Sequence, residues 1–129
     1  MNYHSMMKEY KHTNAYTKLE TANKHDEIKI VLEDLLNNLN ALSYCIKNKP
    51  INSSVKSKSL SQILVALMIL QTSLDFKNGE PIASNLFNLY EYCRKSVISN
   101  YKSQKTDDID ASIDVVSEIF DGWTNIKYI

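Results

Sequence analysis

The residue types that usually carry metal or nucleophilic chemistry are few and scattered in this sequence. One Glu-x-x-His motif, Glu9 to His12, has the spacing used in di-metal carboxylate bundles. Such centres need two of these motifs and two further inward-facing glutamates, and the sequence offers no second motif. Cys45 and Cys93 are too far apart for a zinc or CxxC redox site, and each falls within an apolar helical pattern, which predicts buried thiols. We therefore expect no metal site, no cofactor and no catalytic activity.

Length and composition predict a single all-α domain over residues 1–129. The 129 residues are too few for two domains, and two glycines and two prolines cannot supply the turns of a β-sandwich or barrel. The two glycines are also too far apart for a glycine-rich phosphate loop. Fifteen basic residues balance fifteen acidic ones, so no overall charge draws the chain to nucleic acid or anionic lipid.

Apolar residues recur at alternating steps of three and four in four long segments, which is the pattern of bundle helices. The four seams are Ile28, Leu32, Leu35, Leu39, Leu42 and Ile46; Leu60, Ile63, Leu67, Leu70 and Leu74; Ile82, Leu86, Leu89, Cys93 and Val97; and Ile109, Ile113, Val116, Phe120 and Trp123. Asn78-Gly79 predicts a left-handed end of the second helix, and Glu80-Pro81 the start of the third. Such short connections make neighbouring helices antiparallel, so residues 24–129 should form an up-down-up-down four-helix bundle.

An N-terminal segment and linker, residues 1–23, precede the bundle. Four of its apolar residues fall at i, i+3, i+4 and i+7: Tyr3, Met6, Met7 and Tyr10. A helix this short is marginal alone, so we expect it to dock on the bundle. Met6, Met7, Tyr10 and the following Tyr16 are predicted to cover part of a partner groove.

The second bundle helix has more apolar residues than its seam needs, and the excess indicates a second interface. Its second stripe consists of Val65, Met68, Ile69, Thr72 and Phe76. The third helix adds Phe87, Tyr90 and Arg94, which are residue types favoured at interfaces. Two interpretations stay open: the N-terminal segment alone covers the stripe, or these eight residues bind an amphipathic helix of a partner. Tyr90 also fits an ordinary boundary position with its hydroxyl in water.

The stretch LDFKNGEPIASNLFNLYEYC, residues 74–93, resembles the FliS family of flagellar secretion chaperones, whose pattern is L-D-x-x-x-G-G-E-x-A-x-N-L-x-x-L-Y-x-Y. The matching residues are Leu74, Asp75, Gly79, Glu80, Ala83, Asn85, Leu86, Leu89, Tyr90 and Tyr92. Residues 21–34, TANKHDEIKIVLED, are similar to the family's T-A-S-P-x-x-L-x-x-M-L-Y-D-G, and residues 115–123, VVSEIFDGW, to its closing segment. The chain departs from the pattern by one fewer glycine, the inserted Pro81, and Asn23-Lys24 in place of Ser-Pro.

The resemblance implies a cytoplasmic helical-bundle chaperone without ATPase activity. It would bind the disordered C-terminal segment of flagellin, prevent premature polymerisation and assist delivery to the export gate of the flagellar type III apparatus. We expect no nucleic-acid partner, and either a monomer or a weak homodimer. The longest apolar run, residues 63–70, is far short of the roughly 20 residues that span a bilayer, so no membrane insertion is expected. The alternative function is a non-enzymatic helical-bundle adaptor that binds another protein's amphipathic helix.

Overall fold

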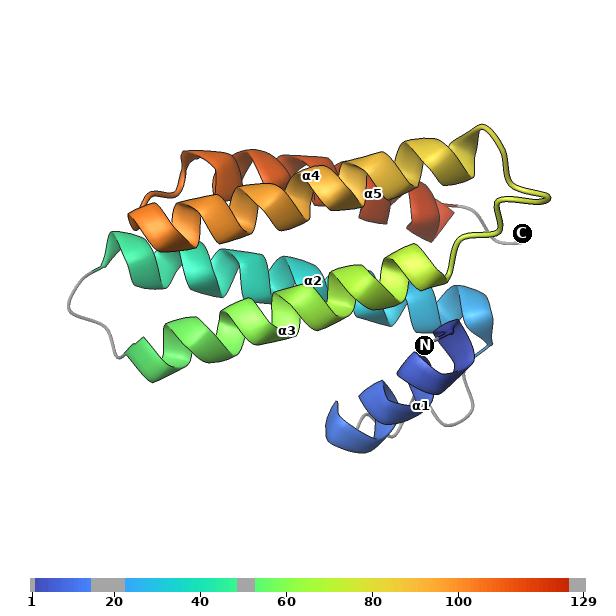
Figure 1. The fold of residues 1–129 in the computed structure, drawn as a ribbon, viewed down its shortest axis with the longest axis horizontal. Helices are drawn as coiled ribbons and strands as arrows, with labels where there is room; N and C mark the ends of the chain where they lie inside the picture. Colours follow the sequence, from blue (N-terminus) through green and yellow to red (C-terminus); the bar gives the residue numbers. More distant parts are fainter. Residues whose placement is uncertain (1, 15–22, 49–52, 126–129) are drawn as a thin grey trace.

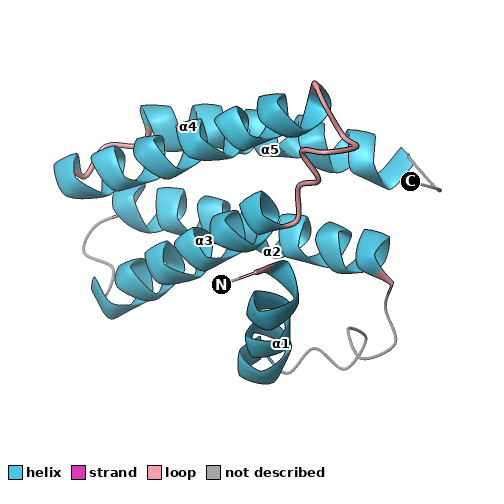
Figure 2. Ribbon diagram, turned by 45° about the vertical axis from the view of Figure 1, so that its right-hand side comes forward, coloured by secondary structure: helices cyan, strands magenta, loops and turns pink. Residues whose placement is uncertain are grey.

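A computed structural model describes residues 2–14, 23–48 and 53–125, and these contain five helices and no strand. The helices are α1 Tyr3–Asn14, α2 Lys24–Lys47, α3 Ser53–Thr72, α4 Ile82–Ser103 and α5 Asp107–Asn125. Helices α2 to α5 run antiparallel in an elongated bundle, and α1 lies across one end of it (Figure 1). The same arrangement is seen after a 45° turn (Figure 2). The predicted all-α four-helix bundle with a docked N-terminal helix is confirmed.

The bundle core is built on the seam of α2, which packs against both α3 and α5. All six seam residues of α2 are buried, from Ile28 to Ile46. Ile63, Leu67 and Leu70 of α3 are fully buried beside them, and α4 closes the ring by packing against α3 and α5. Consecutive helices are therefore neighbours in space, as short antiparallel connections require.

The buried face of α4 differs from the predicted seam at two of five positions, whereas Cys93 and Val97 are buried as predicted. Ile82 and Leu89 are 66% and 37% exposed, whereas Ala83 and Tyr90 are each 3% exposed. Ala83, Tyr90 and Val97 follow one another at seven-residue steps and form the true seam together with Cys93. Burying the tyrosine ring removes more apolar surface from water than burying leucine. This difference favours the rotation of α4 about its axis that places Tyr90, and not Leu89, in the core.

The connection between α3 and α4 is longer than predicted, because α3 ends at Thr72 rather than at Asn78-Gly79. The Asp75 carboxylate accepts hydrogen bonds from the backbone N–H groups of Lys77 and Asn78, which closes a turn. No described glycine has a positive φ, so the left-handed stop at Gly79 is wrong. Glycine is required there for a different reason: a Cβ at this position would lie 2.6 Å from the Asp75 carbonyl oxygen.

The beginning of α2 and the end of α5 are joined by His25 and Trp123. Their rings stack at a centroid distance of 5.1 Å with an interplanar angle of 13°. The indole Nε1–H donates to the His25 carbonyl oxygen at 2.9 Å, and His25 Nε2 lies 3.1 Å from the Trp123 carbonyl oxygen. Trp123 is partly buried and packs against the core, so it closes one end of the bundle.

The Trp123 contact predicts a graded loss of stability. Trp123→Ala should lower the free energy of unfolding by about 3 kcal/mol, because it removes ring packing and leaves a cavity. Trp123→Phe keeps a stacked ring and loses the indole N–H bond, which should cost about 1 kcal/mol. Urea unfolding followed by circular dichroism measures both, since the chain has no second tryptophan for fluorescence. Equal losses for the two variants would show that ring packing contributes nothing.

Candidate functional site

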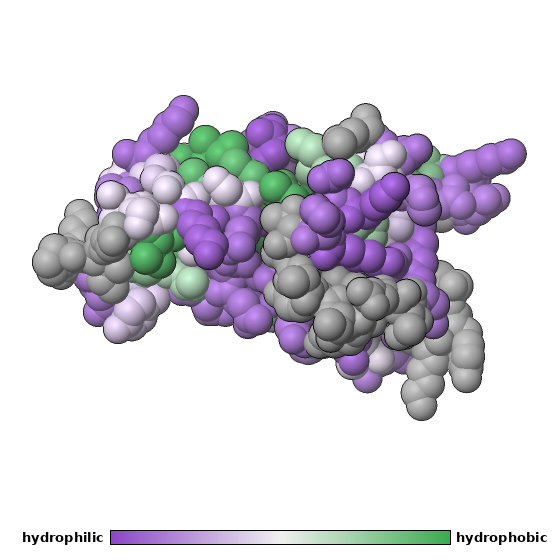
Figure 3. Space-filling view, turned by 90° about the horizontal axis from the view of Figure 1, so that it is seen from below, coloured by the Kyte–Doolittle hydropathy of each residue, from purple (hydrophilic) through white to green (hydrophobic). Residues whose placement is uncertain are grey.

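Four of the predicted partner-binding residues form an exposed apolar strip along α3, the α3–α4 connection and α4. Val65, Met68, Phe76 and Phe87, here called the α3–α4 strip, are 46%, 53%, 47% and 36% exposed. The Phe76 and Phe87 rings meet edge to face, with centroids 6.0 Å apart. Figure 3 shows hydrophobic side chains along the upper edge of one face and in a smaller patch at its left, among hydrophilic side chains. Concentrated exposure of this kind is typical of an interaction surface.

A polar bridge crosses the middle of the strip. Gln71 of α3 donates to the Glu91 carboxylate of α4 at 3.0 Å, and Arg94 donates to the same carboxylate through two nitrogens, each at 2.9 Å. The Arg94 hydrogen bonds, followed by that from Gln71, lower the pKa of Glu91 to about 2. Because the helices are antiparallel, this pairing places Met68 level with Arg94, so the predicted binding residue Arg94 lies on the strip but is already ion-paired.

Three other predicted partner-binding residues offer less surface than the sequence suggested. Ile69 is fully buried and Tyr90 is 3% exposed, so both belong to the core and the prediction of an exposed position is wrong for them. Thr72 is half-buried and its hydroxyl donates to the carbonyl oxygen of Ile69, one turn back in the same helix. The strip therefore consists of the exposed members, with Arg94 and Thr72 at its edge.

Helix α1 docks on α2 through two tyrosine hydroxyls. Tyr3 donates to Glu27 at 2.9 Å and Tyr10 donates to Asp34 at 2.8 Å. Lys11 adds an ion pair with Glu27. The other two predicted groove-covering residues of α1, Met6 and Met7, are buried with Tyr10 in the core cluster, and Tyr16 lies outside the described residues.

The burial of Ile69 shows where α1 lies on the bundle. Ile69 is two residues from Leu67 in sequence, which places it about 200° round α3 from that core position. The bundle helices cannot cover such a position, but α1 packs against α3, and Ile69 belongs to one cluster with Met6, Met7 and Tyr10. Helix α1 therefore covers the Ile69 side of α3 and leaves the α3–α4 strip exposed.

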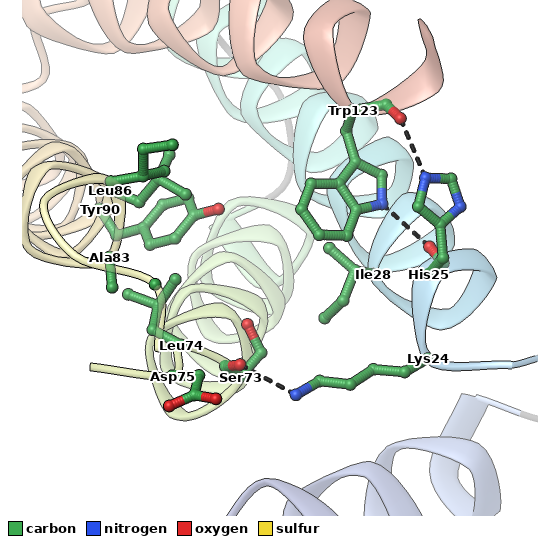
Figure 4. A pocket seen from close by; sticks show the side chains of 12 residues that line it. Lys24, His25, Ile28, Ser73, Leu74, Asp75, Ala83, Leu86, Tyr90 and Trp123 are labelled. Carbon is green, nitrogen blue, oxygen red and sulfur yellow. Dashed lines mark hydrogen bonds between the residues drawn. The ribbon is translucent and has the colours of Figure 1, made fainter. Parts of the chain in front are cut away.

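A pocket of about 340 Å³ opens at the end of the bundle where α2 begins, α5 ends and the α3–α4 connection crosses (Figure 4). Its apolar lining comes from Ile28, Leu74, Ile82, Ala83, Leu86 and Trp123. At its rim, Lys24 Nζ donates to the Ser73 carbonyl oxygen at 3.0 Å and lies 5.0 Å from the centroid of the Tyr3 ring. Hydrogen bonds from Asn78 lower the pKa of Asp75 on the same rim.

The Tyr90 side chain lines this largely apolar pocket. Its hydroxyl points across the pocket toward Trp123 (Figure 4). Burial raises the pKa of Tyr90, and the neighbouring Cys93 adds to the rise. The hydroxyl makes no hydrogen bond to any described residue. No sequence pattern indicates this pocket, because its residues come from four separate segments and its hydroxyl depends on the packing that turns Tyr90 inward.

The described residues meet the requirements neither of a metal site nor of a membrane-spanning helix. No group of three or more His, Cys, Asp and Glu side chains in residues 2–14, 23–48 and 53–125 lies close enough together to hold a metal ion. Cys45 and Cys93 are buried free thiols, as predicted. Across the same part of the chain, no helix has the length and apolar character to cross a membrane.

The family model described as "Flagellar protein FliS" matches residues 6–128, which is nearly the whole chain. No curated protein matches the sequence.

Adjacent positions on α3 test the assignment of its faces. Ile69→Asp should lower the free energy of unfolding by more than 3 kcal/mol or release α1, because it buries an unpaired carboxylate. Met68→Asp should change the melting temperature by no more than a few degrees, since its side chain is half exposed. Thermal unfolding and amide exchange of residues 3–12 measure both effects. Equal destabilisation by the two variants would contradict the assignment.

Proposed function

Because the chain belongs to the FliS family, the family of flagellar export chaperones, we propose that it binds the disordered C-terminal segment of flagellin. Binding would keep flagellin from polymerising before it is exported. This family consists of chaperones rather than enzymes, and the proposal accordingly involves no catalytic step.

The α3–α4 strip is the observation that supports flagellin binding. It brings together two aliphatic and two aromatic side chains, four of the nine large hydrophobic residues that are exposed in the described part of the chain. The strip runs lengthwise along two antiparallel helices, which suits the apolar face of a third helix with anchors at i, i+3 and i+7. Met68 lies at its centre, and its unbranched side chain can adapt to different partner side chains.

The apolar surface of the strip explains how binding would prevent polymerisation. A flagellin segment that polymerises through an apolar helical face is masked when the same face lies on the bundle. The segment loses conformational entropy only on binding, which keeps the complex releasable at the export gate. We propose that the protein acts in the cytoplasm, as a monomer or weak homodimer, and delivers flagellin to an export-gate component.

We further propose that α1 limits access to the binding surface. In the free protein, Met6, Met7 and Tyr10 hide the Ile69 side of α3, which lies directly beside the strip. A flagellin segment broader than the strip would have to displace α1. The tethered helix has an effective concentration of millimolar order, so it competes even if its own contact is weak.

The flagellin proposal is tested by titrating a peptide from the C-terminal segment of flagellin into the protein by calorimetry. Met68→Asp should weaken binding by at least tenfold, because the carboxylate would be desolvated against an apolar helix. Val55→Asp is the matched control, since Val55 is an exposed apolar residue of α3 at the far end of the helix from Phe76, and it should bind normally. An unrelated amphipathic helix that binds as tightly as the flagellin peptide would favour the adaptor function instead.

Removal of residues 1–16 tests the role of α1. The truncated protein should bind the flagellin peptide several-fold more tightly, because apparent affinity is reduced by the fraction of molecules in the closed state. It should also be more prone to self-association, since the Ile69 side of α3 becomes exposed. Calorimetry and size-exclusion chromatography report the two effects. Unchanged affinity together with unchanged solubility would show that α1 does not compete with the peptide.

A further inference from the structure

The end pocket is a second candidate binding site, and its properties do not depend on which partner the α3–α4 strip binds. We propose that it binds one tyrosine side chain of a bound polypeptide, with the ring against Trp123 and Ile28 and the hydroxyl hydrogen-bonded to Tyr90. The proposal rests on the size of the pocket, its lining and the unpaired hydroxyl inside it.

The pocket has room for an aromatic ring. A buried apolar cavity of about 150 Å³ is enough to hold benzene. The end pocket is about 340 Å³, so a phenol ring fits with space for the chain that carries it. One side of the pocket is formed by Trp123, whose position is fixed by its stack on His25 and by its hydrogen bond to the His25 carbonyl oxygen. An aromatic guest would therefore meet a preorganised aromatic surface.

The Tyr90 hydroxyl determines the chemistry of the guest. Tyr90 is 3% exposed, its hydroxyl has no hydrogen-bond partner among the described residues, and it points into the pocket. A purely apolar guest such as phenylalanine would desolvate this hydroxyl without replacing its hydrogen bond, which is unfavourable. A guest with a hydroxyl at the tip of a ring satisfies both groups, because a phenol can donate and accept.

The rim favours a side chain of a polypeptide over a free charged molecule. Lys24 is held by the Ser73 carbonyl oxygen and the Tyr3 ring, and Asp75 is held by the turn of residues 75–78. Both rim charges are therefore already engaged, and neither is free to select an ionic ligand. Ile82 and Leu86 extend the apolar lining from the pocket onto the exposed start of α4, where a peptide backbone can lie.

The experiment uses p-cresol and toluene, two probes that differ only by the hydroxyl group. The single tryptophan gives one indole N–H signal in a ¹H–¹⁵N spectrum, so Trp123 reports pocket binding without assignment. We expect p-cresol to shift this signal saturably and to bind about tenfold more tightly than toluene, as one extra hydrogen bond predicts. N-acetyltyrosine amide should produce the same shift.

Tyr90→Phe should abolish the preference for p-cresol, while its nearly conserved volume keeps the fold. Tyr92→Phe is the matched control, because Tyr92 is an exposed tyrosine two residues away and the preference should persist. Ala83→Leu fills the pocket from α4 and should prevent binding of both probes. The melting temperature of each variant checks that the bundle is intact.

Equal binding of p-cresol and toluene by the wild-type protein, no binding of either, or a preference that survives in Tyr90→Phe would overturn the proposal. Binding of p-cresol with exclusion of N-acetyltyrosine amide would also overturn it, since the pocket would then take free phenols and not a polypeptide side chain. None of these outcomes bears on whether the α3–α4 strip binds flagellin.

Discussion

Helix α3 carries more apolar surface than a four-helix bundle can bury, and this constraint determines how the rest of the chain is arranged. Leu67 and Leu70 face the bundle, Ile69 faces the other way, and Met68 lies between the two sides. A helix that is apolar on all sides must be covered on all sides or serve as an interface. Helix α1 covers the Ile69 side and the bundle covers the seam, so the α3–α4 strip is the part that no described residue covers.

The sequence was sufficient to predict the helices, most of their seam residues and the docked N-terminal helix, because each depends on periodicity within one segment. The α2 seam is correct at every position, since that helix packs against both α3 and α5. Prediction failed where two stripes compete within one helix. In α3 the seam and the second stripe are both apolar, and only the position of α1 determines that Ile69 is buried while Val65 is exposed.

In helix α4, too, periodicity alone does not determine which residues are buried. Leu89 and Tyr90 are adjacent, both are apolar enough for a core, and each belongs to a plausible heptad. Packing against α3 and α5 selects Tyr90 and turns Leu89 outward, and this one-residue shift also turns Ile82 toward solvent. Sequence periodicity cannot resolve such a shift, because the two phases differ in tertiary packing and not in local propensity.

The burial of Tyr90 in place of Leu89 connects the packing of the core to both candidate binding surfaces, the end pocket and the α3–α4 strip. With Tyr90 inward, its hydroxyl reaches the end pocket, which the His25–Trp123 stack closes on the opposite side. With Tyr90 inward, Phe87 also lies on the α3 side of α4, where it meets Phe76. The alternative packing of α4 would bury Leu89 and remove the Tyr90 hydroxyl from the pocket. The position of Phe87 in the strip and that of the Tyr90 hydroxyl in the pocket therefore arise from one packing arrangement, so a substitution that turns α4 about its axis would alter both together.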